Sequence, residues 1–166
     1  MLEIERKFLL SSIPDLSNFK FSEIKQGYIS FVPEIRVRNK DKNYYITSKS
    51  DGTKIRKEIE TEINELTYLI LTNLIKGRLI KKTRYKIPLY NNLIAELDIY
   101  HDELDGLATV EVEFNSEDEA NNFLIPSWFG KDVTSDKRYK NKNLAQMENV
   151  SILKNECEHK SILLKK

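Results

Sequence analysis

The sequence predicts an α+β fold built on about eight β-strands, most of them antiparallel. Three observations favour this fold class. Apolar and charged residues alternate strictly in several segments between residues 3 and 114. Two other segments carry apolar residues at helical spacing. Short polar connections such as Asp51-Gly52 join neighbouring segments, which is typical of antiparallel hairpins.

The strands follow from the alternation. In the first expected strand, residues 3–8, the apolar Ile4 and Phe8 alternate with charged neighbours. A period of two places successive side chains on opposite faces of a strand. The same pattern predicts strands over residues 35–38, 44–49, 55–63, 81–86, 95–99 and 110–114, and a less regular apolar run predicts one more over 24–32. Each strand then has one largely apolar face and one largely charged face.

Two stretches break this period and predict helices. Residues 65–76 carry Leu and Ile around much of a helical circumference, with Asn64 or Thr61 as the N-cap and Gly77 as a C-terminal stop. Ser116 and Glu119 have capping-box spacing for a second helix ending near Pro126. Because helices need an apolar surface to pack on, we expect them to cover the apolar face of the sheet.

The charged face has two alternative environments. If helices cover the apolar face, the charged face lies in solvent when the sheet is open, or lines a lumen when the sheet closes into a barrel. An ordinary eight-stranded barrel has the opposite arrangement, with its apolar face inside. The alternation is the same in both cases, so it does not choose between them.

The composition excludes several classes of protein. In 166 residues, 27 Lys and Arg balance 26 Asp and Glu, and a net charge of +1 gives no overall basic field for nucleic acid or anionic lipid. A single cysteine, Cys157, excludes an intramolecular disulfide, and His101 and His159 are isolated. The first residues are too charged for a signal peptide, and no run approaches the roughly 20 apolar residues of a membrane span. We therefore expect a cytoplasmic protein without nucleic-acid or membrane partners.

The charged face carries like charges in pairs two residues apart. The acidic pairs are Glu3/Glu5, Glu58/Glu60, Glu96/Asp98 and Glu111/Glu113; the basic pairs are Arg36/Arg38 and Lys82/Arg84, with Lys7 and Lys49 single. Clustered carboxylates suit Mg2+ or Mn2+, and clustered Arg and Lys suit a polyanion. Both sets together predict a site for a metal-chelated phosphate chain. The alternative interpretation is a solvated face with cross-strand salt bridges.

These residues also resemble the CYTH superfamily, the triphosphate tunnel metalloenzymes. Glu3-Ile4-Glu5-Arg6-Lys7 is similar to the ExExK signature of that superfamily. The similarity continues in order through Gln26-Gly27-Tyr28, Arg36-Val37-Arg38, Thr47-Ser48-Lys49, Glu58-Ile59-Glu60, Lys82-Thr83-Arg84-Tyr85, Glu96-Leu97-Asp98, Val110-Glu111-Val112-Glu113-Phe114 and Asp136-Lys137-Arg138-Tyr139-Lys140-Asn141. It covers residues 1–146 and implies an eight-stranded antiparallel β-barrel, the triphosphate tunnel, with helices packed outside.

The resemblance also implies roles for individual residues. Glu3, Glu5, Glu111 and Glu113 resemble metal ligands, and Lys7, Arg36, Arg38, Lys49, Lys82 and Arg84 would hold phosphate oxygens. Glu58, Glu60, Glu96 and Asp98 would hold a second metal, orient water or pair the bases. Lys137 or Arg138 would lie near a tunnel mouth and contact substrate, or else form an ordinary basic helix cap.

The predicted function is divalent-metal-dependent hydrolysis of a triphosphate, foremost inorganic tripolyphosphate to pyrophosphate and phosphate. Mg2+ or Mn2+ would activate the water that attacks a terminal phosphoryl group. Lys82 or Arg84 would stabilise the leaving group, and Tyr28 would relay a proton or simply pack. The same fold would also suit an adenylate cyclase, a thiamine or nucleoside triphosphatase, or a non-catalytic polyphosphate-binding module.

The segment 147–166 extends past the resemblance as a C-terminal helical extension or tail. Ile152, Cys157 and the apolar run 162–164 give it a thin apolar stripe among Glu and Lys. This stripe favours a helix packed on the barrel over an oligomer contact or a frayed tail. A homodimer is a further prediction.

Overall fold

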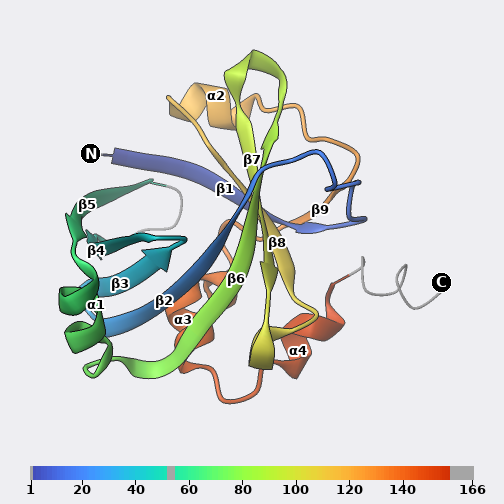
Figure 1. The fold of residues 1–166 in the computed structure, drawn as a ribbon. Helices are drawn as coiled ribbons and strands as arrows, with labels where there is room; N and C mark the ends of the chain where they lie inside the picture. Colours follow the sequence, from blue (N-terminus) through green and yellow to red (C-terminus); the bar gives the residue numbers. More distant parts are fainter. Residues whose placement is uncertain (1, 52–54, 158–166) are drawn as a thin grey trace.

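The computed structural model describes residues 2–51 and 55–157, and its centre is a closed ring of antiparallel strands (Figure 1). The ring strands are β1 (Leu2–Leu10), β2 (Phe21–Phe31), β3 (Glu34–Lys40), β4 (Asn43–Lys49), β5 (Ile55–Ile63), β6 (Lys76–Pro88), β7 (Ile94–Tyr100) and β8 (Ala108–Glu113). They pair in the order β5-β4-β3-β2-β6-β7-β8-β1. Pairing of β1 with β5, where Glu3 lies opposite Arg56, closes the ring. The eight-stranded antiparallel barrel is therefore confirmed.

A ninth strand, β9 (Phe129–Asp132), was not predicted. It pairs with the second half of β1, with Phe8 opposite Asp132 and Leu10 opposite Phe129. Its four residues are too short to display an alternating pattern. The predicted tight turn at Asp51-Gly52 lies partly outside the described residues.

The predicted helices form, but both are shorter than expected. Asn64 caps α1 (Glu65–Thr72) by accepting from Thr67 N at 2.8 Å, and α2 (Glu117–Asn121) begins at Ser116 as its capping box predicts. Gly77 does not end α1; it lies in β6 with φ +73°, where a Cβ atom would stand 2.3 Å from the Ala145 carbonyl oxygen. Tertiary contact, rather than helix termination, requires this glycine.

Two more helices follow β9. They are α3 (Asn141–Gln146) and α4 (Ser151–Asn155), and short 3-10 turns cover Tyr90–Asn92, Asp102–Leu104 and Lys137–Tyr139. The first of these helices was not predicted. The second supports the prediction of a packed C-terminal helix as far as residue 157, while residues 158–166 lie outside the described part. No helix in the described part of the chain is long and apolar enough to cross a membrane.

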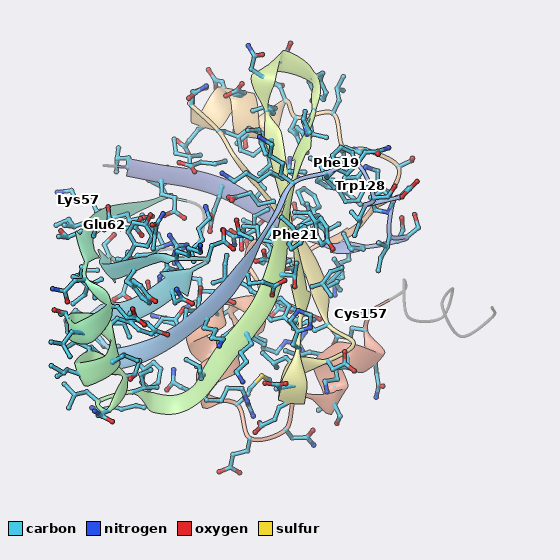
Figure 2. All side chains as sticks on the ribbon, viewed as in Figure 1. Phe19, Phe21, Lys57, Glu62, Trp128 and Cys157 are labelled. Atoms are coloured by element: carbon cyan, nitrogen blue, oxygen red, sulfur yellow. The ribbon has the colours of Figure 1, made fainter. Side chains whose placement is uncertain are left out.

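One apolar layer lies outside the barrel wall. Phe8, Leu97 and Val110 point outward from β1, β7 and β8 and pack with Phe123 and Phe129. Phe19 and Trp128 lie against the same layer (Figure 2). This part of the apolar face is covered, but the aromatic residues that cover it lie on β9 and in connecting segments rather than in α1 or α2.

The covering is incomplete elsewhere. Ile59 on β5 is 71% exposed, and Leu66, Leu69 and Ile70 on α1 are also exposed. Only part of α1 packs on the sheet, with Tyr68 as its buried residue. Apolar periodicity therefore overestimated how much of these elements is buried.

A second apolar cluster, which we call the plug, fills one end of the barrel. Leu9, Tyr28, Ile80 and Tyr100 enter it from the inner faces of the strands. They pack against Val133, Tyr139, Leu144, Ala145, Val150, Leu153 and Cys157, which the chain supplies after β8. The inner face is therefore not charged throughout, because the last part of the chain closes one end of the tunnel.

Candidate active site

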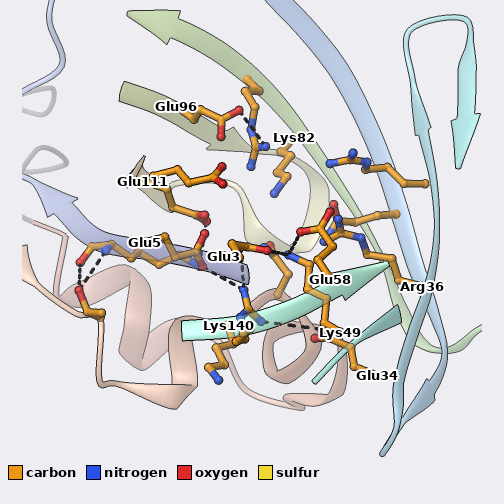
Figure 3. A pocket seen from close by; sticks show the side chains of 18 of the residues that line it. Glu3, Glu5, Glu34, Arg36, Lys49, Glu58, Lys82, Glu96, Glu111 and Lys140 are labelled. Carbon is orange, nitrogen blue, oxygen red and sulfur yellow. Dashed lines mark hydrogen bonds and ion pairs between the residues drawn. The ribbon is translucent and has the colours of Figure 1, made fainter. Parts of the chain in front are cut away.

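The barrel encloses a cavity of about 210 Å3 lined almost wholly by charged side chains (Figure 3). The acids that line it are Glu3, Glu5, Glu34, Glu58, Glu96, Glu111, Glu113 and Asp136; the bases are Lys7, Arg36, Arg38, Lys40, Lys49, Arg56, Lys82, Arg84 and Lys140. Strand alternation explains this composition, because the apolar residues between these positions point away from the lumen. The charged face therefore lines a lumen rather than an open solvated surface.

Acids gather where β1, β8 and β7 run side by side. Glu5 lies directly opposite Glu113, and Glu96 lies directly opposite Glu111. We call Glu3 and these four residues the acidic corner. Burial, followed by the charges of Glu111 and Glu3, raises the pKa of Glu5 well above its usual value. Like charges directly across a sheet are destabilising, so this corner favours an added cation.

Basic side chains partly neutralise the acidic corner. Arg56 donates to Glu5 Oε1 at 2.9 Å and to Glu3 Oε1 at 3.4 Å. Lys49 Nζ lies 3.2 Å from Glu3 Oε2, and Lys7 Nζ lies 3.1 Å from Glu111 Oε1. These ion pairs offset part of the cost of burying the carboxylates in a confined space.

The corner fits a hard divalent cation by its donor chemistry. Its side chains offer only carboxylate oxygens, which Mg2+ and Mn2+ prefer. Glu3 Oε2 is buried and accepts no well-aligned hydrogen bond, although Lys49 is close. Across residues 2–51 and 55–157, no three acidic, His or Cys side chains already surround one ligand position.

Lys82 and Arg84 project from β6 and share one carboxylate. Lys82 Nζ lies 2.8 Å from Asp98 Oδ2, while Arg84 donates to Asp98 Oδ1 at 2.7 Å and to Oδ2 at 2.8 Å. Asp98 is fully buried and does not line the cavity. Burial lowers the pKa of Lys82 to about 8, although Asp98 opposes this shift. Among the alternatives for Asp98, the geometry favours pairing the bases.

Glu60 has a similar position behind the arginines of β3. Its carboxylate accepts from Arg38 at 3.2 Å and from Thr47 Oγ1 at 2.8 Å, and it lies 3.9 Å from Arg36. Glu60 is not among the residues that line the cavity, whereas Glu58 and Glu96 are. Burial and the neighbouring Arg36 lower the pKa of Arg38 to about 10.

Tyr28 lies between the plug and the cavity. Its hydroxyl accepts from Gln26 Nε2 at 3.2 Å, and burial raises its pKa to about 12. Both side chains line the cavity. A proton relay from Tyr28 to Lys82 stays a prediction.

Lys137 and Arg138 do not line the cavity. Arg138 instead pairs with Asp136 at 2.6 Å and with Glu156 at 3.2 Å. The same segment contributes Asp136 and Lys140 to the lining. A position of Lys137 or Arg138 near the tunnel mouth stays a prediction, whereas Asp136 and Lys140 are the charged residues of this segment that reach the lumen.

Several lining residues were missed by the sequence interpretation, notably Glu34 and Arg56. Glu34 precedes Arg36 by two residues, and Arg56 precedes Glu58 by two. Alternation alone places both on the charged face, but neither belongs to a pair of like charge. Glu34 precedes the basic pair Arg36/Arg38, and Arg56 precedes the acidic pair Glu58/Glu60.

Comparisons with known proteins agree with this geometry. A CYTH domain matches residues 1–146. The inorganic triphosphatase of Nitrosomonas europaea is 43% identical over 148 residues, covering 87% of this chain and 97% of that protein. The inorganic triphosphatase of Acetivibrio thermocellus is 35% identical over 149 residues, covering 87% and 93% respectively. A solved structure of an inorganic triphosphatase has a TM-score of 0.68 and 40% identity, covering 87% of this chain and 95% of the other. This chain belongs to the CYTH domain family.

Proposed function

We propose that this protein hydrolyses inorganic tripolyphosphate with the help of Mg2+ or Mn2+. The observation that carries the proposal is an enclosed cavity in which bases and an acidic corner meet. A highly charged linear anion without an apolar part suits such a lining, because each phosphate oxygen can receive a charge-assisted hydrogen bond. The two relatives named inorganic triphosphatase support the same substrate.

The basic residues would hold and orient the substrate. We assign phosphate binding to Lys7, Arg36, Arg38, Lys49, Lys82 and Arg84, all of which line the cavity. Asp98 and Glu60 would keep these bases in place, because each accepts hydrogen bonds from them at less than 3.3 Å. Phosphoryl transfer depends mostly on positioning and charge neutralisation, which this arrangement provides.

The acidic corner would hold the divalent cation through Glu3, Glu5, Glu111 and Glu113. When bound, such a cation neutralises phosphate charge and makes a water molecule more acidic. Glu5, whose pKa is raised by burial and by its acidic neighbours, lies opposite Glu113 within this corner. Lys82 and Arg84 would stabilise the negative charge that develops on the departing pyrophosphate.

The test is phosphate release from tripolyphosphate with Mg2+, with Mn2+ and with a chelator. We expect metal-dependent turnover by the wild-type protein and its loss in Glu5→Gln, which keeps the size of the side chain but removes its charge. Glu62→Gln is the matched control, because Glu62 is exposed on β5 and does not line the cavity. Unchanged turnover in Glu5→Gln would refute the metal assignment, and cyclic AMP as the main product from ATP would refute the hydrolase assignment.

Other predictions accompany this function. We propose a cytoplasmic protein that acts on a small-molecule polyphosphate, without nucleic-acid or membrane partners. The homodimer and the division into residues 1–146 and 147–166 stay predictions. Leu153 in α4, which belongs to the second of these segments, is buried in the plug.

A further inference from the structure

We propose that Glu156 is a positioning residue that acts through Tyr139 on Lys7 in the tunnel. The proposal rests on the proposed function, because Lys7 is one of the bases assigned to phosphate. Glu156 follows α4 and lies beyond the segment matched by the CYTH domain.

Glu156 is held firmly against the barrel by its neighbours. Leu153 and Cys157, on either side of it, are 0% and 2% exposed within the plug. Val150 anchors the start of α4 in the same cluster. The backbone that carries Glu156 is thus anchored by apolar packing on both sides.

The carboxylate of Glu156 reaches two adjacent residues of the turn Lys137–Tyr139. The Tyr139 hydroxyl donates to Glu156 Oε2, and Arg138 donates to both carboxylate oxygens, at 3.3 and 3.2 Å. Tyr139 is fully buried, so its hydroxyl depends on this acceptor. Loss of the carboxylate would leave a buried donor without a partner and release the turn.

The other side of Tyr139 faces the tunnel. Its backbone carbonyl accepts from Lys7 Nζ at 3.0 Å, and the same ammonium group lies 3.1 Å from Glu111. An ammonium group has three N–H donors, so these two contacts set the direction of the third. A shift of the Tyr139 carbonyl would therefore misdirect the Lys7 charge in the cavity.

Arg138 provides a second connection from Glu156 to the cavity. It donates to Asp136 Oδ2 at 2.6 Å, and Asp136 lines the cavity and caps the turn by accepting from Arg138 N at 3.1 Å. The hydrogen bonds of Glu156 to Tyr139 and to Arg138 thus both lead to groups at the closed end of the tunnel.

The experiment measures tripolyphosphate affinity by calorimetry in the presence of EDTA, so that no turnover occurs. We expect Glu156→Ala and Tyr139→Phe each to weaken binding by roughly tenfold. Asn155→Ala is the matched control, because Asn155 is exposed in the same helix. The decisive measurement is the double variant Lys7→Met/Glu156→Ala, which we expect to bind no more weakly than Lys7→Met alone.

Several results would overturn the proposal. Unchanged affinity in Glu156→Ala would do so. So would a double variant whose loss of binding free energy equals the sum of the two single losses, because additivity indicates independent sites. If Glu156→Ala does not fold, the double variant Lys7→Met/Tyr139→Phe is compared with its two single variants by the same criterion. A wild-type protein that releases no phosphate from tripolyphosphate with Mg2+ or Mn2+ would instead refute the proposed function, which separates the two failures.

Discussion

The inner face of the barrel wall and the covered part of its outer face are both buried, but different forces stabilise them. On β6, Lys82 points inward with 1% of its side chain exposed, whereas its neighbour Lys81 points outward with 42% exposed. On β1, Lys7 faces the cavity and Phe8 packs in the outer apolar layer. Burial inside requires paired charges, while burial outside requires only close packing.

This difference explains how the tunnel can contain many charged side chains while the barrel stays folded. The inner register sets Arg84 opposite Asp98 and Lys49 opposite Glu58, so most charges meet an opposite one on the next strand. The acidic corner is the exception, with Glu5 opposite Glu113. The fold therefore pairs most of its interior charges across neighbouring strands and sets like charges opposite each other at one place, where Arg56, Lys49 and Lys7 neutralise them in part.

Removing Asp98 should produce the largest effect. Asp98→Ala leaves Lys82 and Arg84 buried without their shared partner, and we expect a loss of about 3–5 kcal/mol in the free energy of unfolding. Urea denaturation measures it. Asp105→Ala, at an exposed acid, serves as the control. A loss below about 1 kcal/mol would mean that water solvates these bases and that the inner face is not stabilised by pairing.

Truncating a side chain in the outer apolar layer should lower stability almost as much as Asp98→Ala does, but it should leave substrate binding unchanged. Leu10→Ala removes a fully buried side chain from β1, and we expect a loss of about 2–5 kcal/mol through cavity formation. The KM for tripolyphosphate, measured below the unfolding temperature, should not change. Leu2→Ala, at a residue 61% exposed on the same strand, is the control. A changed KM would show that outer packing also determines the geometry of the tunnel.

The pKa of Lys82, about 8, predicts opposite pH dependences for activity and stability. Above this pH the amine loses the charge that neutralises phosphate, so kcat/KM should fall by up to about tenfold per pH unit. An unfolded lysine has a pKa of about 10.4, so the unfolded chain holds one more proton in the interval between these values. This group's contribution to stability should therefore rise with pH across that interval.

Rate profiles and thermal unfolding between pH 7 and 10 check both parts of the Lys82 prediction. Lys82→Arg keeps the charge throughout this range and should remove the alkaline decline in kcat/KM. A decline that persists unchanged in Lys82→Arg would assign it to another group.

The smallest effect is expected next to Lys82, on the outer face. Lys81→Ala breaks only the ion pair with Asp102, whose two side chains are 42% and 64% exposed. Exposed pairs contribute about 0–1 kcal/mol, so stability and turnover should hardly change. A large loss of turnover would contradict the division of β6 into a functional and a solvated face.

The sequence was sufficient for elements whose pattern is local. The alternation at Lys7 and Phe8 or at Lys81 and Lys82 predicted both the strands and the face of each residue. Asn64 and Ser116 likewise predicted where the helices begin, because capping depends on neighbouring residues. The predicted ends of these helices, at Gly77 and near Pro126, were wrong, and β9 was not predicted, because both features depend on distant contacts.

Sequence by itself determined that acids and bases would share one face of the strands, because side-chain direction alternates with each residue of an extended backbone. Only the tertiary structure decided which charges meet. Strand register placed Asp98 behind Lys82 and Glu5 beside Glu113, and the return of the chain brought Glu156 to Tyr139. These contacts join residues far apart in sequence, and ring closure and the plug, rather than any local pattern, bring them together.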